Sequence, residues 1–388
     1  MTDAPDNARC RARDLGITIG NYRTGPLNAI TDVAGVEVGH ATVSWGDADL
    51  PDRHGPARTG VTAIWPRRYD ASGGDDDLMT HPVAAGFFAL AGTGEMTGRS
   101  EIEELGRINT PIVLTNTMGV GTAYDAICRY LVEHDERVGG SEGVVIPVVA
   151  ECDDEYLNDS RGFHVTAAHV AAALDTANSG PVAEGCVGSG TGMICFGFKG
   201  GIGTSSRQVA DGDATWTVGV LTMTNFGRRG RLTVDGVPVG RHIPWGSEAE
   251  LPEQSHRGDR VDGSCIVVVA TDAPLDGRQL ARLAKRAALG LGRTGSAGEN
   301  GSGELLVAFS TGYRPQQGPG VAVQQIIEGE SINDLFAATV DATEEAVLNS
   351  LCMAETTTGR FGRTIHALPL ERVRGLLAEY GRATPAGR

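Results

Sequence analysis

The alternation of apolar and polar positions predicts a chain that mixes strands and helices. Short apolar runs rich in β-branched residues and bounded by Gly, Pro or Asp are typical of strands, and apolar positions repeating every three to four residues indicate helices. The predicted strands cover residues 17–22, 36–45, 59–65, 111–115, 144–150, 215–223, 231–239, 264–271 and 304–310. The predicted helices cover residues 120–134, 164–177, 277–291, 332–353 and 370–380, and surface loops are expected at 46–57 and 69–80.

The order of these elements favours an α+β fold. Strands and helices follow one another irregularly, and Asp235-Gly236 between two apolar runs is a strong signal for an antiparallel hairpin. Layered sheets and helices are therefore expected in place of a doubly wound parallel sheet. Residues 1–14 are polar and are predicted to form a loose tail. We find no clean boundary within residues 1–388, so a single domain is expected.

The composition is that of a compact, acidic protein. Forty per cent of the residues are hydrophobic, and 49 Asp and Glu against 33 Lys and Arg give a formal net charge of -16. This balance argues against binding to nucleic acid or to an anionic membrane surface, since both require basic patches. It is compatible with a substrate that carries a cationic group, such as a free amine.

The cysteines and the lack of long apolar segments predict a cytoplasmic protein. Seven cysteines are scattered without a C-x-x-C pair or a framework spacing, which is typical of reduced thiols. The N-terminus lacks the apolar stretch of a signal peptide. No apolar run reaches the roughly 20 residues that are needed to span a bilayer.

Two patterns that would indicate a cofactor fail on inspection. Residues 188–203 are rich in glycine, but Lys199 lies between Phe and Gly, whereas a Walker loop requires Gly-Lys followed by Ser or Thr, and the G-x-G-x-x-G spacing is absent. His164 and His169 are five residues apart and therefore do not share a helical face. The sequence thus predicts neither a nucleotide nor a metal.

The junction Asp262-Gly263-Ser264-Cys265 has the features of a self-cleavage site. Gly263 lets the backbone adopt the strained geometry that an N-to-O acyl shift requires, and an apolar strand follows directly. Cleavage before Ser264 would give this serine a free α-amine with a pKa near ~8, which can activate its own hydroxyl. The alternative is an ordinary turn that leads into a core strand.

Four polar residues elsewhere are candidates for the same chemistry. Ser302 and Glu304 are two apart at the start of a strand, so their side chains point the same way and can orient a proton near a nucleophile. Asn225 follows a strand and can donate its amide to an oxyanion. Glu151 ends a strand and can bind an ammonium group. In isolation Ser302 and Glu304 favour a polar loop that caps a strand, Asn225 a turn residue, and Glu151 can simply be solvated.

Together these segments resemble the DmpA-type family of self-processing N-terminal-serine aminopeptidases, which includes L-aminopeptidase/D-amidase/D-esterases and β-peptidyl aminopeptidases. The resemblance covers most of residues 14–370, and both the order and the spacing of the motifs hold. The motifs lie at residues 28–33, 36–40, 59–63, 114–117, 148–151, 156–159, 188–207, 262–264, 267–275, 302–304 and 359–369.

The resemblance implies a fold, a cleavage event and a set of roles. The fold would be a four-layer αββα sandwich like that of ornithine acetyltransferase, and cleavage between Gly263 and Ser264 would give chains 1–263 and 264–388. Ser264 would be the nucleophile, Ser302 and Glu304 its helpers, Asn225 the oxyanion donor and Glu151 the group that holds the substrate amine. Members assemble as oligomers, commonly tetramers, and use no metal or organic cofactor. Their substrates are short peptides, amides or esters with a free amine.

The sequence departs from the family pattern at two points. Cys265 follows the nucleophile where an aliphatic residue is expected, and because successive strand residues face opposite ways we interpret it as a core thiol. Residues 152–155 are more acidic than expected, and Asp153 stands where some relatives carry an aromatic side chain. The additional carboxylates predict a preference for cationic substrates.

Two alternatives remain at this point. Acyltransferases of the ornithine-acetyltransferase type and nylon-oligomer hydrolases share the architecture, but they use a threonine nucleophile and the residue here is Ser264. Some acyl transfer to a second amine is still compatible with the same chemistry. The chain can also be an unprocessed binding protein without catalytic activity, and a purified chain that stays whole and inert would support that reading.

Overall fold

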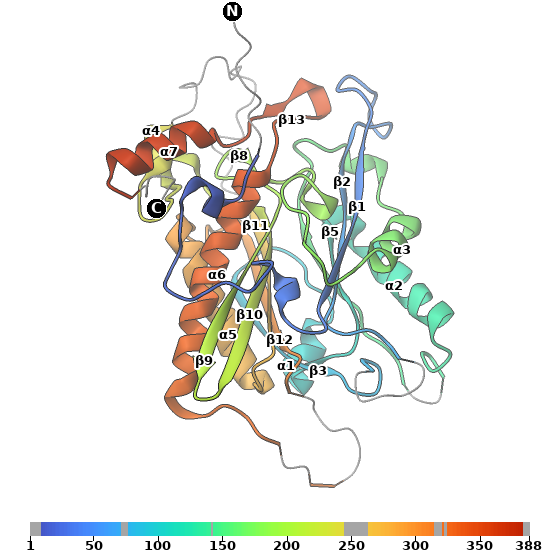
Figure 1. Cartoon of the computed structure of the whole chain (residues 1–388). Coiled ribbons are helices and arrows are strands. Elements are labelled where there is room, and N and C mark those ends of the chain that lie inside the picture. Colours follow the sequence, from blue (N-terminus) through green and yellow to red (C-terminus); the bar gives the residue numbers. More distant parts are fainter. Residues whose placement is uncertain are drawn as a thin grey trace, which may run out of the picture.

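The chain folds into four layers, two facing β-sheets with helices on their outer sides (Figure 1). The computed structural model describes residues 9–70, 77–140, 143–243, 263–313, 320–321 and 324–382. Within this part of the chain the layer order is helix, sheet, sheet, helix. The predicted α+β class and the αββα layering are both confirmed.

The smaller sheet has four strands in the order β1-β2-β5-β6. β5 and β6 are parallel, and the other pairs are antiparallel. Helices α2 and α3 cover its outer face (Figure 1). The bounds are β1 Glu37–Trp45, β2 Ala57–Trp65, β5 Ile112–Asn116, β6 Val148–Cys152, α2 Val120–His134 and α3 Ala167–Asp175.

The larger sheet has six strands in the order β4-β3-β12-β11-β10-β9. β11 and β12 run parallel to each other at its centre, and α5 and α6 pack on its outer face (Figure 1). The bounds are β3 Val83–Gly92, β4 Arg107–Ile108, β9 Ile202–Asp211, β10 Ala214–Asn225, β11 Ser264–Thr271, β12 Gly303–Ser310, α5 Gly277–Thr294 and α6 Ile332–Met353.

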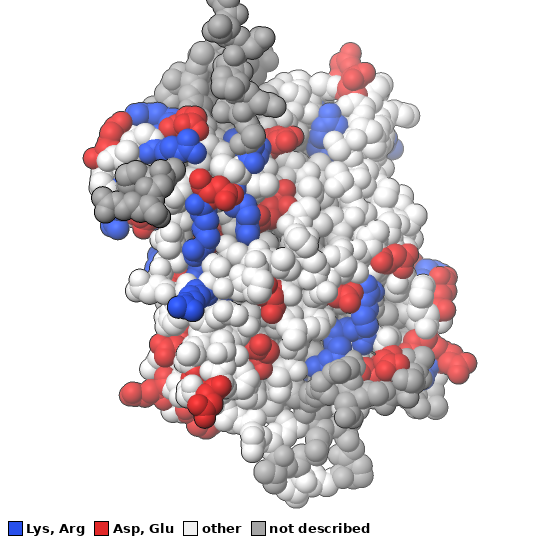
Figure 2. Space-filling view, viewed as in Figure 1, with Lys and Arg blue, Asp and Glu red and all other residues white. Residues whose placement is uncertain are grey.

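Further short α-helices and strands lie between or after these elements. They are α1 Arg99–Leu105, α4 Val239–His242, α7 Leu370–Glu379, the strand pair β7 Ile194–Cys195 and β8 Phe198–Lys199, and the strand pair β13 Thr357–Thr358 and β14 Thr364–Ile365. On the face seen in Figure 2, basic side chains form small groups that are bordered by acidic ones.

The apolar run of β11 is explained by burial on both faces of the strand. Cys265 and Val267 lie in the core between the large sheet and helices α5 and α6. Ile266 and Val268 lie in the core between the two sheets. A strand that is covered on both sides needs apolar residues at every position rather than at alternate ones. The interpretation of Cys265 as a core thiol is confirmed, because it is fully buried.

Three strand predictions are wrong or too long. Residues 17–22 form no strand, and the pairing nearby is limited to one bridge between Arg23 and Gln208. The Asp235-Gly236 turn forms with φ of 48° and 75°, yet its ladder stops at a single bridge. Pro238 follows this turn and has no N–H to extend the ladder. Residues 144–147 precede β6 without pairing, and β6 extends to Cys152.

Part of the predicted loose tail is packed against the fold. Ala12 is fully buried, and its N–H donates to Oδ1 of Asn349 on α6 at 2.9 Å. Arg13 forms an ion pair with the buried Glu345 of the same helix at 2.8 Å. Residues 9–14 therefore belong to the folded body, whereas residues 1–8 lie outside the described residues.

Candidate active site

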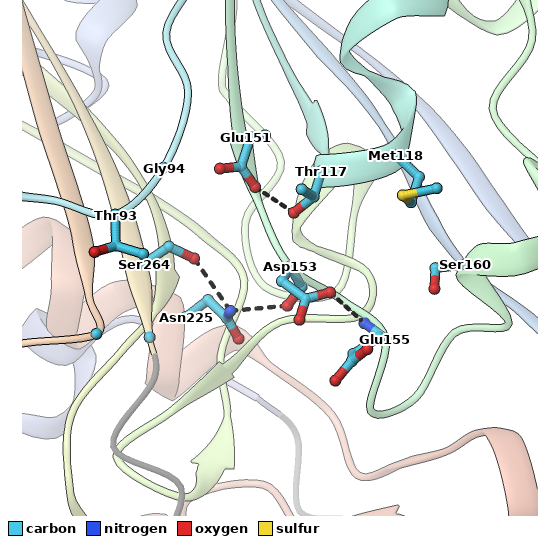
Figure 3. Close-up of a pocket in the computed structure, with 12 residues that line it drawn as sticks. Thr93, Gly94, Thr117, Met118, Glu151, Asp153, Glu155, Ser160, Asn225 and Ser264 are labelled. Carbon is cyan, nitrogen blue, oxygen red and sulfur yellow. Dashed lines mark hydrogen bonds between the residues drawn. The ribbon is translucent and has the colours of Figure 1, made fainter.

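A cavity of about 560 Å³ lies where β6 and β10 end and β11 begins, between the two sheets (Figure 3). Residues from six separate parts of the sequence meet there. They are Thr93, Gly94, Thr117, Met118, Glu151, Asp153, Glu155, Ser160, Asn225, Gly263, Ser264 and Gly301. Three of the predicted site residues, Ser264, Asn225 and Glu151, are thus brought together.

Ser264 is the first residue of β11 and pairs with Asn225, the last residue of β10. It shares its strand face with Ile266, so its side chain points between the sheets rather than toward the helices. The hydroxyl accepts a hydrogen bond from Nδ2 of Asn225 at 3.3 Å, and only 6% of the residue is exposed. The strand register therefore places an amide donor beside this hydroxyl.

Hydrogen bonds hold both polar atoms of the Asn225 side chain, Nδ2 and Oδ1. Its Nδ2 also donates to the carbonyl oxygen of Asp153 at 2.8 Å, and its Oδ1 accepts from the N–H of Ile194 at 3.0 Å. Because the oxygen binds a donor and the nitrogen binds an acceptor, the amide has one orientation, with a hydrogen toward Ser264. A donor that is fixed before the reaction stabilises a developing oxyanion without reorganisation.

Glu151 faces Ser264 from another wall of the cavity (Figure 3). Its Oε1 accepts from the N–H of Glu95 at 3.0 Å, and its Oε2 accepts from the hydroxyl of Thr117. Only 5% of the residue is exposed, and this burial raises the pKa of its carboxyl above the ordinary value. Among the described lining residues none is Lys, Arg or His. A cationic group that enters the cavity therefore meets a desolvated carboxylate.

Ser302 and Glu304 lie beside the junction of Gly263 and Ser264 rather than in the cavity wall. The Ser302 hydroxyl donates to Oε1 of Glu304 at 2.6 Å, and both residues are buried. Burial also raises the pKa of Glu304. Gly303, between them, pairs with Ser264, and its N–H donates to the carbonyl oxygen of Gly263 at 2.9 Å. The pair therefore flanks the peptide bond between Gly263 and Ser264, and Asp262 lies outside the described residues.

The glycine-rich segment 188–203 is organised around a buried cation. Nζ of Lys199 donates to the carbonyl oxygens of Gly190, Met193 and Gly200, at 3.2, 2.8 and 2.8 Å. Three carbonyls satisfy the three hydrogens of the ammonium, which is how a buried charge is tolerated. Lys199 therefore holds the backbone of this loop in place through three hydrogen bonds to its carbonyl groups.

Two contacts of the site were not expected from the sequence. Thr117 binds Glu151, and the main-chain carbonyl of Asp153 orients Asn225. Thr117 lies in one of the motifs quoted above, directly after the buried strand β5, and that position is a signal that could have identified it. The contact of Asp153 is made by its main-chain carbonyl, which every residue type has, so the sequence could not predict it.

The part of the chain that the structure describes offers no candidate metal centre and no candidate membrane-spanning helix. In the described ranges no group of three or more His, Cys, Asp or Glu side chains is arranged to hold a metal ion. None of the helices that the structure describes is both long and apolar enough to cross a membrane.

Solved structures with the same architecture define the class of protein. A β-aminopeptidase from Burkholderia sp. superposes with a TM-score of 0.83 and is 40% identical, covering 96% of this chain and 99% of that one. An L-aminopeptidase D-Ala-esterase/amidase from Ochrobactrum anthropi superposes with a TM-score of 0.86 at 43% identity, with the same coverage. It is described as a prototype for the serine aminopeptidases and a variant of the Ntn hydrolase fold. The fold here is therefore that of an N-terminal-nucleophile hydrolase.

The chain belongs to peptidase family S58, whose model matches residues 28–365. β-Peptidyl aminopeptidase BapA from Sphingosinicella microcystinivorans is 45% identical over 384 residues, 97% of this chain and 94% of the relative. BapA from Sphingosinicella xenopeptidilytica is 45% identical over 373 residues, 94% and 90% of the two chains. The family resemblance and the aminopeptidase class predicted from the sequence are confirmed.

Proposed function

We propose that this protein is a self-cleaving aminopeptidase in which Ser264, freed by cleavage after Gly263, is the nucleophile. The observation that carries the proposal is the hydroxyl of Ser264 beside the fixed amide of Asn225, in a cavity whose other wall holds Glu151. Attack on a substrate carbonyl gives a tetrahedral oxyanion, which Asn225 stabilises. Collapse releases the amine product and leaves an acyl-enzyme that water hydrolyses.

We assign the proton transfers to the α-amine of Ser264, which would be the first residue of the smaller chain. The α-amine of Ser264, with an ordinary pKa near ~8, accepts the proton of its own hydroxyl and returns it to the leaving amine. Ser302 and Glu304 lie next to this position on β12, and their 2.6 Å hydrogen bond orients them as a unit. We assign them the role of holding and orienting the amine, with no metal or organic cofactor.

Glu151 would select substrates with an unblocked amine. A buried carboxylate without a basic neighbour in the described cavity wall gains from pairing with an ammonium. An acetylated N-terminus has no such charge. The activity is therefore aminopeptidase rather than endopeptidase activity, on short peptides, amides or esters. The names of the relatives support β-amino-acid and D-amino-acid derivatives as substrates to test, alongside L-α-peptides.

Two measurements test this function together. Intact mass spectrometry of the purified protein is expected to show chains 1–263 and 264–388. Hydrolysis of a short peptide is expected to require a free N-terminus, so that the acetylated peptide stays intact. One uncut chain without activity would instead support a non-catalytic binding protein, and efficient acyl transfer to an added amine in place of hydrolysis would support an acyltransferase.

The proposal extends to the assembly and the compartment of the enzyme. We propose a homo-oligomer, a tetramer, that works in the cytoplasm and binds neither nucleic acid nor a membrane. The net charge of -16 supports the last point. Light scattering of the purified protein measures the assembly, and a monomer at micromolar concentration would contradict it.

We expect a preference for substrates with a basic N-terminal residue. Asp153 and Glu155 line the cavity beside Glu151, at alternate positions of the chain, so the wall has more carboxylates than one ammonium needs. Arg- and Lys-anilides should be hydrolysed with a kcat/KM at least about tenfold above that of Ala-anilide, since a charge-assisted contact contributes about 1.5–3 kcal/mol, or roughly 10–150-fold.

The matched variants are Asp153→Asn, which should reduce this ratio, and Ser160→Ala at an uncharged position of the same wall, which should not. Equal kcat/KM values for the three anilides in the parent enzyme would contradict the predicted preference for basic residues.

A further inference from the structure

The two sides of Ser264 along the large sheet offer different hydrogen-bond donors. β11 lies between β10 and β12, so one neighbour contributes Asn225 and the other contributes Gly303. Asn225 on β10 donates its side-chain amide to the hydroxyl of Ser264. Gly303 on β12 donates its main-chain N–H to the carbonyl oxygen of Gly263 at 2.9 Å. The carbonyl at the proposed cleavage site is therefore turned toward β12 and away from Asn225.

We propose that self-cleavage and substrate hydrolysis use different oxyanion donors, the N–H of Gly303 for the carbonyl of Gly263 and the amide of Asn225 for substrates. The inference rests on the proposed role of Ser264. In self-cleavage the Ser264 hydroxyl oxygen bonds to the carbonyl carbon of Gly263, the bond from that carbon to the Ser264 nitrogen breaks, and the hydroxyl proton moves to this nitrogen. The resulting ester takes up one water, which gives a carboxyl group on Gly263 and restores the hydroxyl.

The peptide group that joins Ser302 to Gly303 is held at both ends before any reaction. Its carbonyl oxygen accepts from the N–H of Thr93 at 3.1 Å, while its N–H donates to Gly263. Successive hydrogen bonds of this kind polarise one another and strengthen the final donor. A donor already at 2.9 Å from the ground-state carbonyl strengthens further as negative charge develops on that oxygen.

The packing around Gly303 shows why this donor is held so closely. A Cβ at position 303 would lie 2.4 Å from the carbonyl oxygen of Thr93 and 3.2 Å from Cα of Gly94. The turn at residues 93–94 thus approaches the β12 backbone to a distance that only glycine allows. A larger residue here forces the donor to move. At the paired position Gly92, by contrast, a Cβ meets nothing within 4 Å.

The first test separates the two donors with Asn225→Ala in the full chain. The rate of self-cleavage, followed by intact mass after synthesis in a cell-free system, should stay within about threefold of the parent. The kcat/KM of the cleaved variant on a free-amine peptide should fall about 10²–10³-fold, the usual effect of losing one oxyanion donor. A cleavage rate that falls as far as kcat/KM would overturn the proposal.

The second test moves the other donor with Gly303→Ala, using Gly92→Ala as the matched control. Self-cleavage of Gly303→Ala should slow at least about tenfold, and Gly92→Ala should cleave at the parental rate. Circular dichroism establishes that each variant is folded. A folded Gly303→Ala chain that cleaves normally would also overturn the proposal, and the Asn225→Ala result decides if that chain does not fold. Failure of the proposed function is distinct, since either the parent chain would then stay uncut or Ser264→Ala would cleave as well.

Discussion

Ser264→Ala is expected to yield one uncut chain of 388 residues with no measurable aminopeptidase activity. The substitution removes the oxygen that we propose attacks both the Gly263 carbonyl and the substrate. The methyl group of alanine fits this buried site, where only 6% of Ser264 is exposed. Loss of a nucleophile typically lowers turnover on the order of 10⁴-fold or more. Intact mass and the hydrolysis of a free-amine peptide, measured beside the parent, give the two results.

Cys265→Ala is the control for this experiment. Its thiol lies in the helix-side core, and burial raises its pKa well above the ordinary value. We therefore expect that it does not attack Gly263 and that this variant is still cleaved. A small chain that begins at residue 265 would transfer the role from serine to the thiol. Cleavage of Ser264→Ala at the parental rate would exclude Ser264 as the attacking residue.

Glu151→Gln is expected to lower kcat/KM for free-amine substrates roughly 30- to 5,000-fold, because losing one partner of a buried charge pair costs about 2–5 kcal/mol. The glutamine keeps the shape and still accepts from the N–H of Glu95. The exposed Glu95→Gln is the matched control and should stay within about threefold, since its main chain rather than its side chain contacts Glu151. An unchanged kcat/KM in Glu151→Gln would assign the substrate amine to another group.

The raised pKa of Glu151 gives the same variant a pH signature. In the parent, kcat/KM should fall as the pH drops through this raised pKa, because a protonated Glu151 no longer pairs with an ammonium. The raised pKa of Glu151 has the opposite effect on the free energy of unfolding. The folded state binds the proton more tightly than the unfolded state, so the parent loses stability as pH rises through this window. Glu151→Gln should therefore lose the fall that Glu151 causes, keep the separate acid limb of the Ser264 α-amine, and melt at the same or a higher temperature at neutral pH.

Much of the fold could be predicted because both faces of the central elements are buried. The bounds of β11, α2 and α6 match the predicted ranges, since their apolar patterns are long and end at clear boundaries. β3 and β9 were not predicted. β9 begins at Ile202 within a glycine-rich stretch and carries Thr and Ser that bind neighbouring backbone, as when Thr204 donates to the carbonyl of Val220. Polar residues in a buried strand do not give the expected pattern.

For the site, the sequence predicted which residues are involved better than how they are arranged. Ser264 and Asn225 end adjacent strands, and the strand register that pairs them cannot be derived from either segment alone. Ser302 and Glu304 share a hydrogen bond, as their two-residue spacing indicated, but they flank the Gly263 carbonyl rather than line the cavity. Contacts made by main-chain groups, at Asp153 and Gly303, are independent of residue type and required the structure.

The position of β11 in the larger sheet has a consequence for the mature enzyme. Cleavage before Ser264 would leave β11 and β12 on the shorter polypeptide, inserted between β3 and β10 of the longer one. Helix α6, also on the shorter polypeptide, packs across β9 and β10. The two polypeptides would therefore share one sheet and could separate only by breaking ladders on both sides. Once unfolded they would have to meet by diffusion, so refolding of the cut protein would speed up with concentration, whereas the uncut Ser264→Ala chain would refold at a rate independent of it.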